Sequence, residues 1–242
     1  AVQVTIGGAT VTIGAMAKGS GMIHPNMATM LGFVTTDADV DAAALRSALQ
    51  EATERSFNMI TVDGDTSTND MVVVLANGLA GNPRITADSV HYREFADALA
   101  AVLIHLAKEI ARDGEGATKL IEVRVKGAPT LADARKAARS VCGSNLVKAA
   151  VFGEDANWGR VLAALGYSGA QFDPAKVDLW LGDVQMMRAG EPLAFDEETA
   201  ARVLSRKEVV FTADLHAGDA EATAWGCDLT YDYVKINGSY RT

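Results

Sequence analysis

The sequence predicts an α+β fold in which sheets and helices form layers. Several short segments alternate between apolar and polar residues, which is typical of half-buried strands. Other segments place apolar residues at helical spacing, and both kinds of segment occur along the whole chain. Some predicted strands follow one another as hairpins. Because strands and helices do not strictly alternate, layered α+β packing is favoured.

The composition is that of an ordinary globular protein and argues against several classes of partner. With 242 residues, of which 49% are apolar, the chain can bury a sizeable core in one or two domains. A formal net charge of −9 argues against nucleic acids and anionic membranes as partners. No apolar run approaches the roughly 20 residues of a membrane span and no signal peptide is seen, so a cytoplasmic setting is expected. Because Ala1 stands directly before a predicted strand, we expect upstream sequence, in this or another polypeptide.

The metal-ligating residue types are not arranged as a metal site. Cys142 and Cys227 lie far apart without Cys-x-x-Cys spacing, and the four histidines are scattered. The acidic stretch 63–70 resembles a calcium loop, but Val74 stands where an EF-hand carries its glutamate. We therefore expect no metal and no bound cofactor, and we interpret residues 63–70 as a structural loop.

The first part of the chain is predicted to hold a hairpin, further strands and two helices. Gly7-Gly8 separates two alternating runs, which is typical of a hairpin turn, and an aspartate precedes each helical pattern as an N-cap. Glycine at 114 fits the end of the longer helix. The predicted elements are strands over 2–6, 10–13 and 29–35, a helix from Asp39 or Asp41 to about Phe57, a strand over 71–75, a helix from Asp88 to Asp113, and a strand over 121–125 with one buried and one wet face.

After residue 129 a second module is expected to begin. Thr130 and Asp196 can each cap a helix, and Gly182-Asp183 reads as a turn between two strands. The predicted elements are a helix from Thr130 to about Cys142, a buried strand over 146–152, a helix over 157–165, strands over 177–181 and 184–187, a helix from Asp196 to about Arg206, strands over 208–215 and 222–236, and a tail over 237–242.

Residues 18–36 suggest a nucleophile. A turn-rich loop with Lys18, Gly19 and Gly21 leads into an apolar, β-prone run that Thr29 opens. If the Ala28–Thr29 bond were cut, the free α-amine of Thr29 could act as the base for its own hydroxyl, as in N-terminal-threonine nucleophiles. The local pattern alone favours an ordinary strand residue at this position.

The run KGSGMIHPNMATML, from Lys18 to Leu31, resembles the signature of the ornithine acetyltransferase (glutamate N-acetyltransferase) family. Members cut themselves before the threonine of the Ala-Thr-Met-Leu motif. The likeness covers essentially all 242 residues and matches the C-terminal part of a family precursor. It implies an αββα sandwich similar to N-terminal-nucleophile enzymes, with a second α/β module. The implied division is 1–28 as the end of the α chain, 29–127 as the catalytic β-chain module and 128–242 as the C-terminal module with a substrate-contacting tail.

The resemblance also implies the site residues. Thr29 becomes the nucleophile and first residue of the mature β chain, and Ala28 becomes the last residue of the α chain. Lys18, Thr29, Glu115, Asn237 and Thr242 become the substrate contacts. Without the resemblance, a loop lysine, a carboxylate between glycines and a chain end would be read as solvated or frayed. The 63–70 loop then lies near the site.

The implied reaction moves an acetyl group from N2-acetylornithine to glutamate through an acetyl-threonine intermediate, as a step in arginine biosynthesis. Acetyl-CoA is a possible further donor, since some family members are bifunctional. The implied partners are the two small-molecule substrates and an α chain whose Thr-Gly pair, upstream of Ala1, forms the oxyanion hole in an α2β2 assembly. Two alternatives stay open: an N-terminal-threonine hydrolase that uses water, and an uncleaved fragment without catalytic activity.

Overall fold

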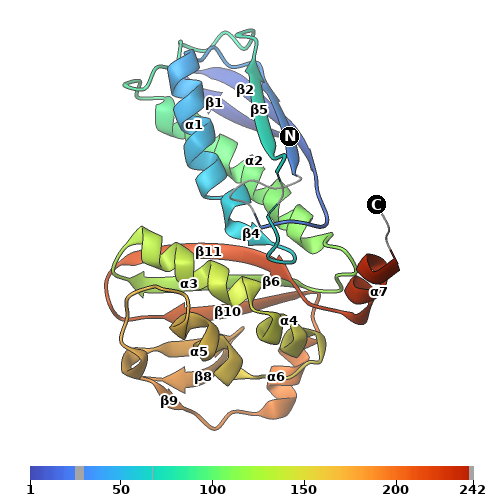
Figure 1. Cartoon of the computed structure of the whole chain (residues 1–242). Helices are drawn as coiled ribbons and strands as arrows, with labels where there is room; N and C mark the ends of the chain where they lie inside the picture. Colours follow the sequence, from blue (N-terminus) through green and yellow to red (C-terminus); the bar gives the residue numbers. More distant parts are fainter. Residues whose placement is uncertain (25–29, 67, 240–242) are drawn as a thin grey trace. The chain divides into compact units, whose positions relative to one another are not determined.

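The computed structural model describes residues 1–24, 30–66 and 68–239, and the chain forms two compact units. The first unit comprises Ala1–Met59 and Asp65–Ile110, and the second comprises Ile60–Gly64 and Ala111–Thr242 (Figure 1). The chain therefore divides after Ile110, whereas the sequence places the start of the second module after residue 127. The difference arises because the strand β6 (Leu120–Ala128) pairs with strands of the second unit.

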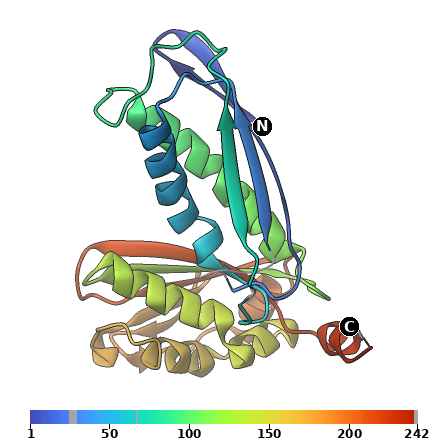
Figure 2. The same ribbon diagram turned by 45° about the horizontal axis from the view of Figure 1, so that its top comes forward.

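The first unit is built on a four-stranded sheet with the order β1-β2-β3-β5. The hairpin is antiparallel and continues antiparallel into β3, and β5 joins β3 in parallel. Helices α1 and α2 lie on one side of this sheet (Figure 2). The elements are β1 (Val2–Ile6), β2 (Ala9–Lys18), β3 (Leu31–Thr36), α1 (Ala42–Glu54), the 3-10 turn η1 (Phe57–Met59), β5 (Met71–Ala76) and α2 (Tyr92–Arg112).

Two local signals of this unit are confirmed, whereas the predicted cap Asp88 is wrong, because α2 begins only at Tyr92. Gly7 and Gly8 both have positive φ, at 57° and 87°, as a two-residue hairpin turn of the I′ type requires. Asp41, not Asp39, caps α1 through its side-chain bonds to backbone N–H groups. The buried face of α1 consists of Ala44, Ala48 and Ala52. The small alanine side chains allow the helix to approach its neighbours closely.

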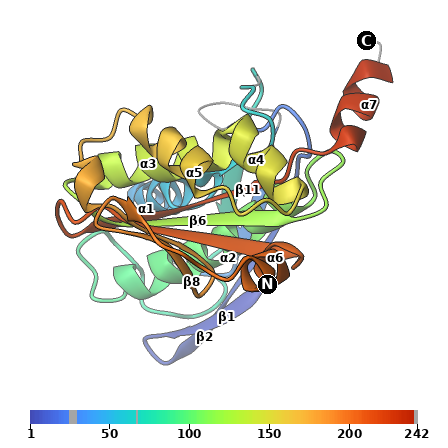
Figure 3. The ribbon, with the colours of Figure 1, turned by 90° about the horizontal axis from the view of Figure 1, so that it is seen from below.

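The second unit is built on a seven-stranded sheet with the order β4-β11-β6-β10-β7-β8-β9. Strands β6 and β10 are parallel, as are β4 and β11, and the other neighbours are antiparallel. Figure 3 shows α3, α4 and α5 on one side of this sheet. The strands are β4 (Ile60–Thr61), β6 (Leu120–Ala128), β7 (Asp178–Leu181), β8 (Val184–Arg188), β9 (Glu191–Pro192), β10 (Glu208–Asp214) and β11 (Ala220–Cys227), and the helices are α3 (Leu131–Gly143), α4 (Asn145–Phe152), α5 (Trp158–Gly166), the 3-10 turn η2 (Pro174–Lys176), α6 (Glu197–Leu204) and α7 (Tyr231–Ser239).

Two predicted strands of the second unit are wrong. Residues 146–152 form helix α4, which Ser144 caps by accepting a hydrogen bond from the backbone N–H of Val147. The run 222–236 is a strand only as far as Cys227, and α7 begins at Tyr231. Both segments are short apolar runs, in which periodicity does not separate a strand from a buried or partly exposed helix.

The prediction that one face of β6 is exposed to water is wrong at one residue, Glu122. Glu122 is only 4% exposed, because Trp225 lies opposite it on β11. The Trp225 indole N–H donates to Glu122 Oε2 at 2.8 Å, and the Arg124 guanidinium lies 2.6 Å from Glu122 Oε1. The carboxylate therefore keeps its hydrogen bonds and a cationic partner while losing most of its water.

A second carboxylate is held at the end of the same sheet. Asp178 accepts the backbone N–H of Ala189 at 2.7 Å, and its other oxygen lies 3.0 Å from His216 Nε2. Partial burial by itself would raise the pKa of Asp178. The bonds to Ala189 and His216 outweigh that effect and hold the pKa below its ordinary value.

In the described parts of the chain, no helix combines the length and the low charge that a membrane crossing requires.

Candidate active site

Three of the expected site residues lie outside the described residues, namely Ala28, Thr29 and Thr242. The other three are described. Lys18 is the exposed last residue of β2 and pairs with Leu31 of β3. Lys18 therefore lies opposite the first residue of β3, which is two residues after Thr29 in the sequence. Glu115 and Asn237 belong to the second unit.

The residue directly after Thr29 is firmly held. Met30 is 2% exposed, and its backbone N–H donates to Asp70 Oδ1 at 2.6 Å. Its carbonyl accepts the backbone N–H of Met71 at 3.0 Å. Burial raises the pKa of Asp70, although the bond from Met30 acts in the opposite direction. The sequence placed Asp70 in a structural loop without this role.

The structure brings Glu115 and Asn237 together. Glu115 lies in the loop between α2 and β6, and Asn237 lies in α7. The Asn237 Nδ2 group donates to Glu115 Oε2 at 3.0 Å and to the backbone carbonyl of Tyr233 at 3.1 Å. One carboxylate oxygen of Glu115 thus holds the side chain of Asn237. A negatively charged carboxylate and a neutral amide therefore lie side by side.

Close backbone contacts hold the Glu115 loop against α7. Gly116 has φ +69°, and a Cβ atom there would lie 2.6 Å from the backbone nitrogen of Tyr233. Thr230 Oγ1 donates to the carbonyl of Gly116 at 2.7 Å. Although α7 has no buried residue, it is attached by these contacts and by the Tyr231 ring, which packs edge-on against Phe152 with the ring centroids 5.5 Å apart.

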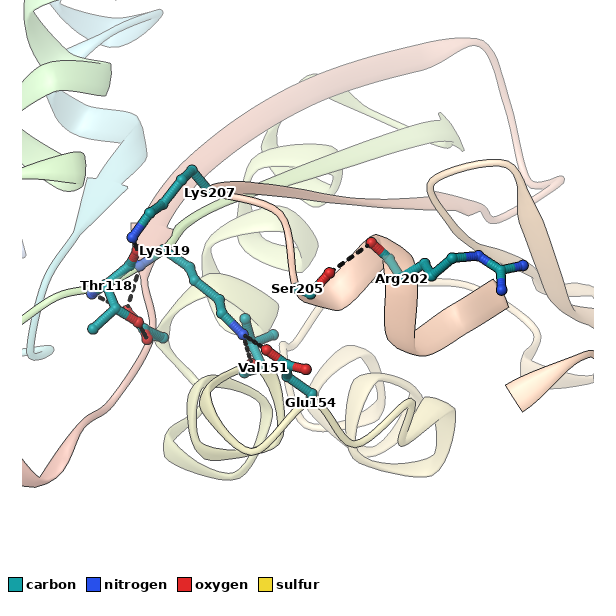
Figure 4. A network of polar contacts seen from close by, with 8 residues as sticks. Thr118, Lys119, Val151, Glu154, Arg202, Ser205 and Lys207 are labelled. Atoms are coloured by element: carbon teal, nitrogen blue, oxygen red, sulfur yellow. Dashed lines mark hydrogen bonds and ion pairs between the residues drawn. The ribbon is translucent and has the colours of Figure 1, made fainter. Parts of the chain in front are cut away.

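Asp228 anchors the other end of the same loop. Its carboxylate is 3% exposed and accepts three hydrogen bonds: from the backbone N–H of Thr118 at 2.8 Å, from that of Lys119 at 2.9 Å, and from the Thr118 hydroxyl. Figure 4 shows the Lys119 side chain extending toward α4, where it donates to the Val151 carbonyl at 3.1 Å and to Glu154 at 2.9 Å. No sequence motif indicated Asp228, whose partners are more than a hundred residues away.

Lys148 is a buried lysine that contacts Cys227, the residue directly before Asp228. It is 1% exposed, and its ammonium donates to the Cys227 carbonyl and lies 3.6 Å from Cys227 Sγ. Burial raises the pKa of both the Cys142 and the Cys227 thiols, an effect that Lys148 only partly offsets. Neither cysteine therefore has the thiolate character of a nucleophile.

Within the described ranges, no three His, Cys, Asp or Glu side chains are grouped so that they could hold a metal ion. The expectation that the chain binds no metal and no cofactor remains a prediction.

Known proteins similar to this chain agree on one family. The ArgJ family model matches residues 1–242. A protein of Symbiobacterium thermophilum named arginine biosynthesis bifunctional protein ArgJ is 89% identical over 242 residues, which are 100% of this chain and 60% of the relative. The protein of the same name from Geobacillus stearothermophilus is 60% identical over 240 residues, or 99% of this chain and 58% of the relative. The chain thus spans about 60% of the length of these curated relatives.

A solved structure confirms the predicted fold class. The crystal structure of the arginine biosynthesis bifunctional protein argJ from Bacillus halodurans matches with a TM-score of 0.86 and 50% sequence identity, over 88% of this chain and 100% of that chain. The α+β sandwich with an ornithine acetyltransferase-like fold is therefore confirmed, as is the resemblance read from residues 18–31. The chain belongs to the ArgJ family.

Proposed function

We propose that this chain is the self-processing, acetyl-transferring part of an arginine-biosynthesis enzyme. The proposed reaction moves the acetyl group of N2-acetylornithine to glutamate through an acetyl ester on Thr29. Family membership over residues 1–242 carries the proposal, together with the name of a relative that is 89% identical. We expect a cytoplasmic α2β2 assembly, with acetyl-CoA as a possible second donor.

Maturation is an acyl shift followed by hydrolysis. The Thr29 hydroxyl attacks the Ala28 carbonyl, so that an O–C ester bond forms, the C–N peptide bond breaks and the threonine nitrogen takes up the proton. Water then hydrolyses the ester, which leaves a carboxylate on Ala28 and a free hydroxyl and α-amine on Thr29.

Turnover uses the same hydroxyl twice. The α-amine of Thr29, with an ordinary pKa of about 8, accepts the hydroxyl proton as Oγ attacks the acetyl carbonyl. Ornithine leaves with that proton on its amine, and the amine of glutamate then attacks the acetyl ester to form N-acetylglutamate. Two donors of the upstream α chain would stabilise the tetrahedral oxyanion, each contributing about 3–4 kcal/mol.

Glu115, Asn237 and Lys18 are proposed to bind the amino-acid substrate. A carboxylate suits the side-chain ammonium of ornithine, and the 3.0 Å bond from Asn237 orients Glu115 while one of its oxygens stays available. The exposed ammonium of Lys18 suits the substrate carboxylate or the reacting carbonyl. Thr242, the last residue, is proposed as a further contact.

Mass spectrometry of the protein with its upstream α chain tests the proposal. After incubation with isotope-labelled N2-acetylornithine, label is expected on a peptide that begins at Thr29. Glutamate should remove this label rapidly and water slowly. Equally rapid loss to water would favour the hydrolase, and an intact, unlabelled Ala28–Thr29 peptide would favour the uncleaved, non-catalytic form.

Substitution of Glu115 tests the binding role. Glu115→Gln keeps an oxygen for Asn237 but removes the charge that attracts an ammonium. We expect the KM for N2-acetylornithine to rise about tenfold or more, because charge-assisted hydrogen bonds are roughly twice as strong as neutral ones. Glu191→Gln, a change of an exposed carboxylate in β9, is the matched control. Unchanged kinetics for Glu115→Gln would contradict the assignment.

A further inference from the structure

The polar loop that precedes β5 contacts the chain on both sides of the proposed cut. We name the described residues of this loop, 65–66 and 68–70, the clamp loop. Upstream of the cut, the Thr66 hydroxyl donates to the backbone carbonyl of His24 at 3.2 Å. Downstream, Asp70 accepts the backbone N–H of Met30 at 2.6 Å. One short loop of the first unit therefore binds the last described residue before the gap at 25–29 and the first one after it.

One of the two bound residues, Met30, lies in the core, and the other, His24, follows a core residue. Ile23, next to His24, is 0% exposed, and Met30 is 2% exposed. The Met30 carbonyl accepts the N–H of Met71, the residue that follows the clamp loop and opens β5. Both polar groups of the Met30 backbone are thus bonded to Asp70 and its neighbour. The nitrogen that Asp70 binds belongs to the residue that directly follows Thr29 in the sequence, so this bond restrains the backbone at that point.

We propose that the clamp loop positions the Ala28–Thr29 bond for self-cleavage and that Asp70 is the positioning residue for Thr29. This inference rests on the proposed function. An acyl shift between adjacent residues needs the hydroxyl and the carbonyl held at about 3–3.5 Å, and a misplacement of about 1 Å can cost roughly a hundredfold in rate. The clamp loop bonds to the chain on either side of residues 25–29, at His24 and at Met30.

Asp37 offers a matched control in the same sheet. Its Oδ1 accepts the backbone N–H of Thr12 at 2.7 Å, and the residue is half-buried, as Asp70 is. A loss of ordinary sheet stability would therefore follow from either Asp37→Ala or Asp70→Ala. A loss of positioning would follow from Asp70→Ala alone.

The test follows cleavage of the full-length precursor, including its upstream part, after cell-free synthesis. The fragment that begins at Thr29 is quantified on denaturing gels and identified by mass spectrometry. Asp70→Ala is expected to slow cleavage about tenfold or more, Thr66→Val by a few-fold, and Asp37→Ala by less than about twofold. Asp70→Asn keeps an acceptor oxygen and should restore most of the rate. Melting curves by circular dichroism verify that each variant folds.

A second readout separates positioning from stability. In protein that has been cut to completion, Asp70→Ala should lower kcat about tenfold and leave the KM for both substrates within about twofold. Cleavage of Asp70→Ala at the rate of Asp37→Ala would overturn the inference and leave the proposed function standing. A wild-type precursor that is never cut would overturn both.

Discussion

Replacing Asp228 by alanine should destabilise the second unit strongly. Asp228 is 3% exposed, and its carboxylate accepts three hydrogen bonds from Thr118 and Lys119. These two residues directly precede β6. Alanine removes all three acceptor positions at once. The buried N–H of Lys119 then has no replacement partner, whereas Thr118 is exposed and can bind water.

The expected cost follows from these unequal losses. A stranded buried N–H costs about 1–3 kcal/mol, and each hydrogen bond to a charged group contributes about 1.5–3 kcal/mol. Bonds that share one acceptor are not additive, and water replaces part of the loss at Thr118. We therefore expect Asp228→Ala to lower the free energy of unfolding of the second unit by about 3–5 kcal/mol.

Tryptophan fluorescence provides an assay specific to this unit. All three tryptophans, Trp158, Trp180 and Trp225, belong to the second unit, so their emission during urea unfolding reports on it alone. The control is Asp173→Ala, which removes a comparable bond to the N–H of Ala175 at an exposed site. That change should cost about 1 kcal/mol or less.

The isosteric variant sharpens the test. Both backbone N–H groups point to Asp228 Oδ1, and only the Thr118 hydroxyl points to Oδ2. Asparagine can keep its oxygen toward the backbone and donate its amide to that hydroxyl, which rotates to accept. We expect Asp228→Asn to cost about 1 kcal/mol. A cost of about 1 kcal/mol or less for Asp228→Ala, or equal costs for the two variants, would refute this account of the anchor.

Three further predictions concern the second unit. Gly116→Ala should destabilise it by about 2 kcal/mol and raise the substrate KM, since alanine is strained at φ +69° and its Cβ would displace Tyr233; unchanged urea midpoint and KM would count against this. Asp178 has a lowered folded pKa, so its carboxylate stabilises the fold above the unfolded pKa of 3.8, and that stabilisation is lost as the pH falls through the folded value. The melting temperature of Asp178→Asn should therefore lie below wild type at about pH 6 and converge with it toward about pH 3; a constant gap would contradict the sign. The thiols of Cys142 and Cys227, 0% and 2% exposed, should react with a thiol reagent at neutral pH only after unfolding; rapid labelling of the native protein would disprove their burial.

Local signals in the sequence predicted much of the fold. The hairpin turn at Gly7-Gly8 and the caps at Thr130 and Asp196 were predicted correctly. Each of these features depends on bonds between residues at most three apart, so a short window of sequence contains all of its partners. The family motif at residues 18–31 identified the family for the same reason, because its information lies in one continuous run.

Segments with mixed or short periodicity were predicted less well. Residues 146–152 and 231–236 carry enough apolar and β-branched residues to suggest strands, yet both are helical. The cap at Ser144 was the local signal that could have corrected the first. For α7 the corresponding signal was Thr230, whose hydroxyl accepts the backbone N–H of Tyr233 at 3.3 Å, whereas the attachment of α7 to the distant loop through Gly116 and Glu115 has no local signal.

The sequence by itself therefore determined the family, the fold class and most helix starts, since these follow from contiguous motifs and short-range hydrogen bonds. Only the tertiary structure decided which polar side chains are buried and what they hold. Glu122 meets Trp225 across 103 residues, Asp228 meets Thr118 across 110, and Asp70 meets Met30 across 40. A carboxylate that accepts backbone N–H groups from a remote segment looks like any solvated aspartate or glutamate in the sequence, because the desolvation and the donors that define its role come from other parts of the chain.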